Sequence, residues 1–165
     1  MSTVHLRHAV RAVILDEDDR ILLCRFVFAK PDGPMVVWAA PGGGVEAGES
    51  LLTALRRELR EEVGLTCAAD PPHVWHQVVL DPGHAAGFDG VINDYFLIRT
   101  ASFDPRGALS DDELAAENVT RFEWWRPQHI IGYRGAELFS PRDLAGALAT
   151  LLSGGPPETP VRLGE

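Results

Sequence analysis

The sequence predicts an α/β fold in which helices cover a mixed β-sheet. Short runs rich in β-branched and aromatic residues recur along the chain, and other segments repeat apolar residues every three or four positions. The first pattern is typical of strands and the second of helices, and together they favour a layered architecture with at least two helices. Residues 1–165 suit one domain with a sizeable core, without repeats or a second domain.

The N-terminal part is expected to be mainly β-structure. Residues 6–15 and 20–28 are largely apolar, and the acidic segment 16–19 between them is typical of a turn. These runs predict a hairpin or two neighbouring strands. Residues 36–40 predict a short strand that leads into the glycine-rich segment 41–44.

The clearest helix is expected over residues 50–63. Ser50 suits the N-cap of this helix and Gly64 suits its C-cap. Its apolar residues recur at spacings of three and four and share one stripe, which should face the core: Leu52, Leu55, Leu59 and Val63.

The second half of the chain predicts three more strands and one more helix. The strands are expected at 74–80, 91–99 and 121–125. The polar, acidic segment 100–118 predicts a long loop or a short helix. A Ser-Pro start followed by helical periodicity predicts a helix near 141–152, and the tail from about 153 is expected to be flexible.

Composition and charge exclude several classes of function. The net charge of −9 opposes binding of a nucleic-acid polymer, although a small anionic substrate can still be met by local cations or backbone N–H groups. No apolar run is long enough for a membrane helix, and the N-terminus lacks a signal-peptide pattern, so the expected location is cytoplasmic. Cys24 and Cys67 lie in apolar stretches and are expected to be buried, reduced thiols.

The segment 43–65 carries the strongest chemical signal. Glu58 and Glu62 are four residues apart on the predicted helix, and Glu61 projects nearby. Three crowded carboxylates repel one another unless a cation neutralises them. Because the donors are hard oxygen atoms without Cys or His, the cluster suits Mg²⁺ or Mn²⁺ rather than zinc.

The glycine-rich loop before the helix adds a candidate phosphate site. Four glycines allow sharp turns and a close approach of the backbone to a ligand: Gly42, Gly43, Gly44 and Gly48. The loop leads into a helix N-terminus, where free N–H groups favour anions. Glu49 and Arg57 are eight residues apart, about two helical turns, and could pair to brace the loop against the helix.

These residues match the Nudix box, G-x5-E-x7-R-E-U-x-E-E-x-G-U with U a bulky aliphatic residue, at every specified position of 43–65. The resemblance implies a Nudix fold, an α/β/α sandwich around a mixed sheet. It implies hydrolysis of a nucleoside diphosphate linked to another group, with release of a phosphorylated nucleoside. It also implies that Glu58, Glu61 and Glu62 hold Mg²⁺, for which Mn²⁺ can substitute, and that the carbonyl of Gly43 or Gly42 completes the metal's ligands.

The residue that takes the proton from the attacking water is left open between two positions. By resemblance to the family, it is either Glu58 in the box or a carboxylate on a loop outside the box. In this sequence the loop is expected at 104–118, with Glu117 as the first choice and Glu113 as the second. Arg57 is expected to support the catalytic glutamates, and Gly42, Gly43 and Gly44 to contact the substrate.

The sequence says less about substrate choice. Five aromatic residues are candidates for stacking on a substrate ring, although aromatics in strands are mostly core: Trp75, Phe88, Tyr95, Trp124 and Trp125. Neighbouring residues of a strand point to opposite faces, so at most one residue of the Trp124-Trp125 pair is expected to face the core. Pro82 is a weak hint of an ADP-ribose-type substrate by its distance from the box.

Several readings compete with a hydrolase or add to it. His73, His76 and His84 suggest a metal site, but lone histidines are mostly structural or exposed, so none is expected. A Nudix-like module that senses a nucleotide without cleaving it is the main alternative. An isomerase on the same fold would need a reactive cysteine and is disfavoured by the apolar surroundings of Cys24 and Cys67. The expected partner is a small nucleotide-like substrate, and a homodimer is left open.

Overall fold

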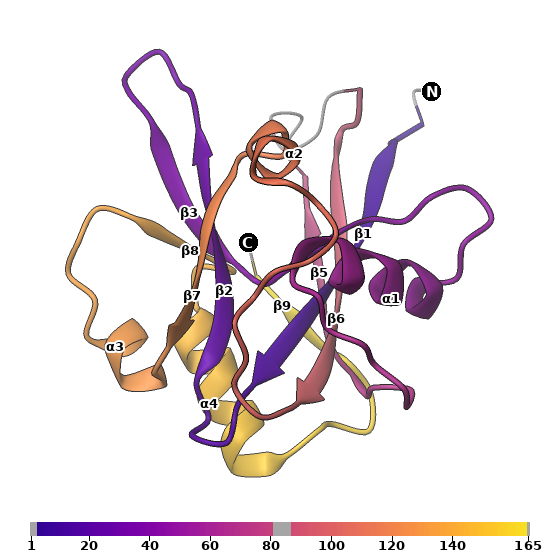
Figure 1. Ribbon diagram of the computed structural model, residues 1–165, viewed down its shortest axis with the longest axis vertical. Coiled ribbons are helices and arrows are strands. Elements are labelled where there is room, and N and C mark those ends of the chain that lie inside the picture. The colour runs from indigo at the N-terminus through magenta and orange to yellow at the C-terminus, as the bar shows by residue number, and fades with distance from the viewer. Residues whose placement is uncertain (1–2, 81–86, 165) are drawn as a thin grey trace.

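The computed structural model describes residues 3–80 and 87–164 (Figure 1). Strands from both halves of the chain build one mixed sheet of nine strands in this part of the chain. Their bounds are β1 (Leu6–Leu15), β2 (Ile21–Phe28), β3 (Met35–Ala39), β4 (Gly42–Gly44), β5 (His73–Val79), β6 (Gly90–Arg99), β7 (Val119–Trp125), β8 (Leu138–Ser140) and β9 (Val161–Leu163). The main path runs β8-β3-β2-β1-β6-β5-β9, while β4 pairs with β1 and β7 pairs with β2.

The sheet divides into two wings where β1 and β2 separate. These strands meet beside their turn, where Leu15 lies opposite Ile21. Farther along, β1 pairs with β4, so that Gly43 lies opposite Val10, whereas β2 pairs with β7. On its other edge β1 runs parallel to β6 over its whole length. The glycine-rich segment therefore enters the opening between the two wings.

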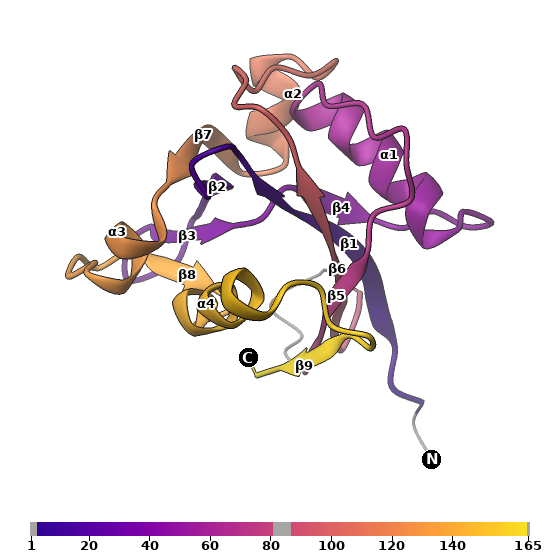
Figure 2. The same ribbon diagram turned by 90° about the horizontal axis from the view of Figure 1, so that it is seen from below.

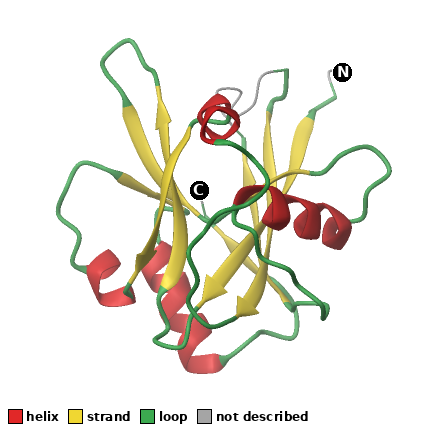
Figure 3. Cartoon of the chain, viewed as in Figure 1, coloured by secondary structure: helices red, strands yellow, loops and turns green. Residues whose placement is uncertain are grey.

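Helices cover both sides of the sheet, as Figures 2 and 3 show. The helices α1 (Leu51–Glu62) and α2 (Asp111–Ala116) lie on one side, and α3 (Pro127–Ile131) and α4 (Leu144–Gly154) lie on the other. This arrangement confirms the predicted α/β/α sandwich with a mixed sheet. None of these helices is long and apolar enough to cross a membrane.

Two apolar clusters hold the layers together. The cluster under α1 contains Leu55 and Leu59, which pack on Val10 and Ile14 of β1. A second cluster joins the opposite face of the sheet to α3 and α4, and it includes the fully buried Leu148. The residues of β1 are thus buried on both faces, which is why its sequence is nearly continuous in apolar residues.

Helix α1 begins where its sequence predicts, but its C-cap is Val63, one residue before the predicted Gly64. The Ser50 side chain accepts a hydrogen bond from the backbone N–H of Thr53 at 3.1 Å, which is an N-cap. Leu55, Leu59 and Val63 are buried, so the predicted stripe faces the core. Gly64 follows the helix with a φ of +76°, and a Cβ there would lie 2.1 Å from the Arg106 carbonyl oxygen, so the position requires glycine.

Four short elements were not predicted from the sequence. They are β4, α3, β8 and β9, none longer than five residues. The tail from about 153 was expected to be flexible, but α4 continues to Gly154 and part of the tail forms β9, which runs parallel to β5. The C-terminal helix also begins later than predicted, with Asp143 as its N-cap.

The prediction for the two neighbouring tryptophans was wrong. Trp124 packs against the cluster under α1, and Trp125 packs against the cluster beside α3 and α4. The two side chains do point to opposite faces, but helices or loops cover the sheet on both of them. Each ring therefore packs on a core.

Candidate active site

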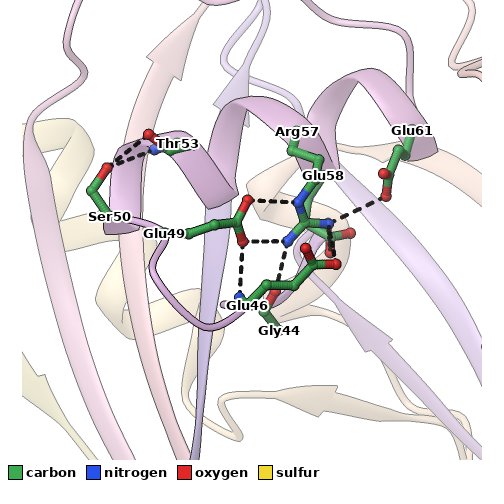
Figure 4. Close-up of polar contacts among 8 residues, drawn as sticks. All are labelled: Gly44, Glu46, Glu49, Ser50, Thr53, Arg57, Glu58 and Glu61. Atoms are coloured by element: carbon green, nitrogen blue, oxygen red, sulfur yellow. Dashed lines mark hydrogen bonds and ion pairs between the residues drawn. The ribbon is translucent and has the colours of Figure 1, made fainter.

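Arg57 is the centre of the polar contacts around the glycine-rich loop (Figure 4). Its Nε and Nη2 donate to the two carboxylate oxygens of Glu49, each at 2.8 Å, and Nη2 also donates to the Gly44 carbonyl at 3.0 Å. Its Nη1 donates to Glu58 at 2.8 Å and to Glu61 at 3.4 Å. The predicted pair of Glu49 and Arg57 is present, and it fixes the loop against α1.

This pairing changes the acidity of both groups. The hydrogen bonds from Arg57, followed by one from the Glu46 backbone N–H, lower the pKa of Glu49 to about 2. The hydrogen bond to Glu49 in turn raises the pKa of Arg57 above its ordinary value. Both groups are therefore charged near neutral pH.

Glu62 is the most deeply buried of the box glutamates. Only 1% of Glu62 is exposed, and its Oε1 accepts a hydrogen bond from the Gly42 backbone N–H at 3.1 Å. Burial and the nearby charge of Glu58 raise the pKa of Glu62 to about 8, although Arg11 and the Gly42 bond act in the opposite direction. Such a buried carboxyl is costly to ionise without a nearby cation.

Glu58 lies directly against the backbone of the glycine segment. A Cβ on Gly43 would lie 2.5 to 2.6 Å from the Glu58 carboxyl atoms, so the absence of a side chain at Gly43 makes room for them. Burial raises the pKa of Glu58, while the hydrogen bond from Arg57 partly opposes that rise. The carboxylate, the glycine backbone and the arginine are thus in direct contact.

The carboxylates outside the box have different surroundings. Glu117 is the C-cap of α2, and electrostatic interactions link it to Glu58, Glu61 and Glu62. Burial, followed by the charge of Glu61, raises its pKa. Glu113 instead accepts a hydrogen bond from the Ser110 backbone N–H at 3.1 Å and closes the capping box of α2. Of the two loop candidates, only Glu117 approaches the box glutamates.

A buried network of polar side chains below the glycine-rich loop was not predicted from the sequence. Arg11 donates from Nη1 to the Ala40 carbonyl at 2.8 Å and from Nε to Asn93 at 3.2 Å. Asn93 donates to Gln77, and Gln77 donates to the Gly164 carbonyl at 2.9 Å. The signal in the sequence was a single arginine within the otherwise apolar run 9–15.

A family model described as the NUDIX domain matches residues 5–144. The chain belongs to the Nudix family. It is similar to an RNA pyrophosphohydrolase from Caulobacter vibrioides, with 32% identity over 132 residues, 73% of this chain and 70% of that protein. It is also similar to the nucleoside triphosphatase NudI from Escherichia coli, with 31% identity over 122 residues, 73% of this chain and 82% of that protein.

A solved structure supports the Nudix fold. A Nudix hydrolase from Nitrosomonas europaea has a TM-score of 0.65 and 21% identity, over 92% of this chain and 91% of that one. At this identity the likeness shows the fold alone. Together with the family match, it makes this chain a Nudix hydrolase of the pyrophosphohydrolase family.

The donor set of the Nudix box fits a hard divalent cation. Glu58, Glu61, Glu62 and the Gly43 carbonyl offer oxygen atoms alone, and burial, followed by the charge of Glu58, raises the pKa of Glu62, a shift that a bound cation would oppose. Within the described residues, no set of three His, Cys, Asp or Glu side chains is already gathered as a finished metal site. The donor chemistry therefore fits Mg²⁺ or Mn²⁺, with side chains that must still adjust around the ion.

Two cavities differ in their relation to this Nudix site. One of about 270 Å³ reaches Glu62 and is bounded by the loop at Asp104 and by Phe122 of β7. A larger one of about 550 Å³ lies between α4 and the C-terminal tail, with Trp75 and Leu163 in its wall. None of the box glutamates lines the larger cavity, so the smaller cavity, which reaches Glu62, is the one that belongs to the candidate active site.

The histidines named in the sequence do cluster, although around a carboxylate. His73, His76 and also His8 lie 2.5 to 2.8 Å from the carboxylate oxygens of Asp94. Burial alone would raise the pKa of Asp94, but the hydrogen bonds from His76 and His8 outweigh it and lower that pKa. The cluster thus links β1, β5 and β6 of the sheet. His84 and Pro82 lie outside the described residues.

The remaining candidates separate into core and surface. Trp75 and Tyr95 are 2% and 1% exposed and contact each other edge to face, so neither is free to stack on a substrate. Phe88 is 38% exposed. Both cysteines are free thiols: Cys24 is buried, which raises its pKa, and Cys67 is only partly buried.

Proposed function

We propose that this Nudix hydrolase cleaves the diphosphate linkage of a nucleoside diphosphate joined to another group, releasing a phosphorylated nucleoside. The observation that carries the proposal is the buried Glu62 carboxyl at the Gly42 backbone, next to Glu58 and within electrostatic reach of Glu117. A buried group of carboxylates beside a glycine backbone is suited to a divalent cation and a phosphate. We also propose that residues 1–165 act as one domain.

Glu58, Glu61 and Glu62, with the Gly43 carbonyl, are the residues we propose to hold Mg²⁺ or Mn²⁺. When bound, the ion supplies charge neutralisation at the phosphate oxygens and acidifies a coordinated water. Arg57 keeps Glu49, Glu58 and the Gly44 carbonyl in fixed relative positions. The proposed role of this arginine is thus to position the donors, and that of Gly42, Gly43 and Gly44 is to let a phosphate approach the backbone.

Glu117 is the residue we propose as the general base. The attacking water gives its proton to the Glu117 carboxylate as its oxygen bonds to phosphorus, and the bridging P–O bond breaks with its electron pair passing to the leaving phosphate. Two observations support Glu117 over Glu58. The Glu58 carboxylate is engaged by Arg57 at 2.8 Å, whereas burial and the charge of Glu61 raise the pKa of Glu117, which makes its carboxylate a stronger base.

The names of the relatives suggest which substrates to test first. Nucleoside triphosphates come first because the net charge of −9 opposes a long polyanion. An RNA with a 5′-triphosphate belongs in the same panel because of the similarity to an RNA pyrophosphohydrolase. Dinucleoside polyphosphates and ADP-ribose complete the set of diphosphate linkages.

A substrate panel tests the proposal directly. Each compound is incubated with Mg²⁺ or Mn²⁺, and release of mononucleotide and phosphate is measured for the wild type and for Glu62→Gln. We expect metal-dependent turnover of at least one compound by the wild type. The turnover rate of Glu62→Gln should be lower by about 100-fold or more, because the substitution removes a proposed metal ligand. Binding without turnover across the panel would support a nucleotide sensor instead.

The base is tested with a matched pair of variants. Glu117→Gln should lower kcat by about 100-fold, because general-base catalysis contributes on this scale. Glu113 lies on α2, the helix that Glu117 caps, and Glu113→Gln serves as the control, with kcat expected within about threefold of the wild type. Equal rates for the two variants would exclude Glu117 as the base and return the role to Glu58.

A further inference from the structure

A second arginine, Arg7 of β1, lies against the glycine segment from the other side. Ala9 of β1 pairs with Gly44 of β4, and the Arg7 guanidinium covers the Gly44 backbone. A Cβ on Gly44 would lie 2.7 Å from Arg7 Nη2, 3.1 Å from Nε and 3.2 Å from Cζ. All three atoms belong to the planar head group, so the arginine can take this position only because residue 44 has no side chain.

Arg7 differs from the other arginines of the site in its hydrogen bonds. All three nitrogens of the Arg57 guanidinium donate hydrogen bonds, to Glu49, Glu58, Glu61 and the Gly44 carbonyl. Arg11 donates two, to the Ala40 carbonyl and to Asn93. For Arg7, by contrast, no hydrogen bond or ion pair connects the guanidinium to another residue in the ranges 3–80 and 87–164. A partly buried guanidinium with free donors in a protein of net charge −9 is poised to bind an anion.

The position of Arg7 relates it to the proposed catalytic groups. Glu58 lies against Gly43, and Arg7 lies against the next residue of the same short strand, Gly44. The charge of Arg7 also acts on the Glu117 carboxylate. The arginine and the glutamates therefore border one region at β4.

We propose that Arg7 binds a phosphate of the substrate, namely the one next to the phosphate attacked by water. The proposal rests on the proposed function, since it presumes a substrate with at least two linked phosphates at β4. A guanidinium can donate two parallel hydrogen bonds to one phosphate, which fixes the orientation of the group as well as its charge. Gly44 is then a specificity element, because it leaves room for that guanidinium.

The first test measures binding without turnover. Imidodiphosphate, a pyrophosphate analogue with a P–N–P bridge, is titrated into the full chain in the presence of Mg²⁺ by isothermal calorimetry. We expect Arg7→Ala to raise the Kd about 10- to 100-fold, the effect of losing hydrogen bonds to a charged group. Arg7→Lys should lose less, because it keeps the charge but not the two parallel donors.

A matched control separates this site from general electrostatics. Arg134 is exposed in the segment between α3 and β8, so Arg134→Ala removes the same charge far from β4. We expect its Kd to stay within about twofold of the wild type. An unchanged Kd in Arg7→Ala, or an equal loss in Arg134→Ala, would overturn the proposal.

Gly44→Ala provides a second route that leaves the charge in place. The added Cβ must displace the flexible end of Arg7, and the backbone of Gly44 does not need a positive φ. We expect weaker binding of imidodiphosphate in Gly44→Ala, and no further loss when it is combined with Arg7→Ala. Fully additive losses would show that the two residues act independently and would refute the role given to Gly44.

The outcome also distinguishes the two proposals from each other. If imidodiphosphate binding depends on Arg7 but no compound of the panel is hydrolysed, the anion site stands and the hydrolase proposal fails. If a substrate is found, Arg7→Ala should raise KM by a factor close to that in Kd and change kcat much less. Turnover with an unchanged KM and Kd in Arg7→Ala overturns the anion site and leaves the hydrolase proposal standing.

Discussion

Replacing Glu62 by glutamine should stabilise the metal-free protein while abolishing its activity. Burial and Glu58 raise the pKa of Glu62 to about 8 from an ordinary value of 4.5. This difference in pKa corresponds to about 5 kcal/mol for ionising Glu62 in the folded protein, at 1.36 kcal/mol per pH unit. The value is an upper bound, because part of the shift comes from charge repulsion with Glu58, which can itself take up a proton. We therefore expect Glu62→Gln to gain about 2–3 kcal/mol at pH 8.

The sign of the effect follows from the protons bound in each state. In the folded wild type Glu62 keeps its proton up to about pH 8, whereas in the unfolded chain it loses the proton above about pH 4.5. The stability that this protonation contributes is complete below pH 4.5 and is lost as the pH rises towards 8. The advantage of glutamine should therefore be near zero at pH 4.5, grow through this window and level off above it.

Thermal unfolding followed by circular dichroism checks this expectation. Both proteins are measured with a chelator from pH 5 to pH 9, and the difference in Tm should reach about 4–12 °C at the alkaline end, from about 2–4 °C per kcal/mol at this chain length. Excess Mg²⁺ should then raise the Tm of the wild type and leave Glu62→Gln unchanged. A difference in Tm that is independent of pH, or a glutamine variant that is less stable throughout, would refute the reasoning.

Three further changes probe neighbouring contacts. Gly43→Ala places a Cβ within 2.6 Å of the Glu58 carboxyl, so kcat/KM in the substrate assay should fall at least about tenfold while circular dichroism shows a folded protein. Arg57→Lys cannot keep both bonds to Glu49, and we expect a lower Tm and a loss of activity of about tenfold or more. Asp94→Asn removes the negative charge that three histidines contact, so we expect a lower Tm than that of the wild type near neutral pH. Because the pKa of Asp94 is lowered in the folded protein, the wild type should lose the stability that the charge contributes as the pH falls below about 4. The difference in Tm between the two proteins should therefore become smaller in acid.

Local signals in the sequence were enough to predict the long elements and the centre of the site. The spacing of Leu55, Leu59 and Val63 located α1, and Ser50 marked its first turn. The box glutamates required only the helical period to be placed side by side. Such features depend on residues within a few turns of one another, which is why a single sequence suffices for them.

Features that depend on distant parts of the chain could not be predicted. The strands β4, β8 and β9 have three residues each, too few to show a period, and they exist because a neighbouring strand offers an edge. The carboxylate of Asp94 gathers His8 from β1 and His76 from β5, which lie far apart in the sequence. Such pairings follow from the order of strands in the sheet.

The same reasoning applies to the arginines of the site. Arg57 was recognised because its partner Glu49 lies only eight residues away. The contacts of Arg11 with Asn93, and of Arg7 with Gly44, join residues more than 35 positions apart. Arg11 stood out only as a single arginine within an apolar run, and the sequence alone did not indicate the partner of either arginine.

The route of hydrogen bonds below the loop has a practical consequence for anyone who produces this protein. The Gly164 carbonyl, next to the last residue, is bound by Gln77, which leads through Asn93 and Arg11 to the Ala40 carbonyl. A purification tag or fluorescent protein fused after residue 165 would lie next to the hydrogen bond between Gln77 and the Gly164 carbonyl and could disturb it. Within the described residues, positions 3 and 4 make no hydrogen bond to this network, so we expect a sequence fused before them to leave it unchanged.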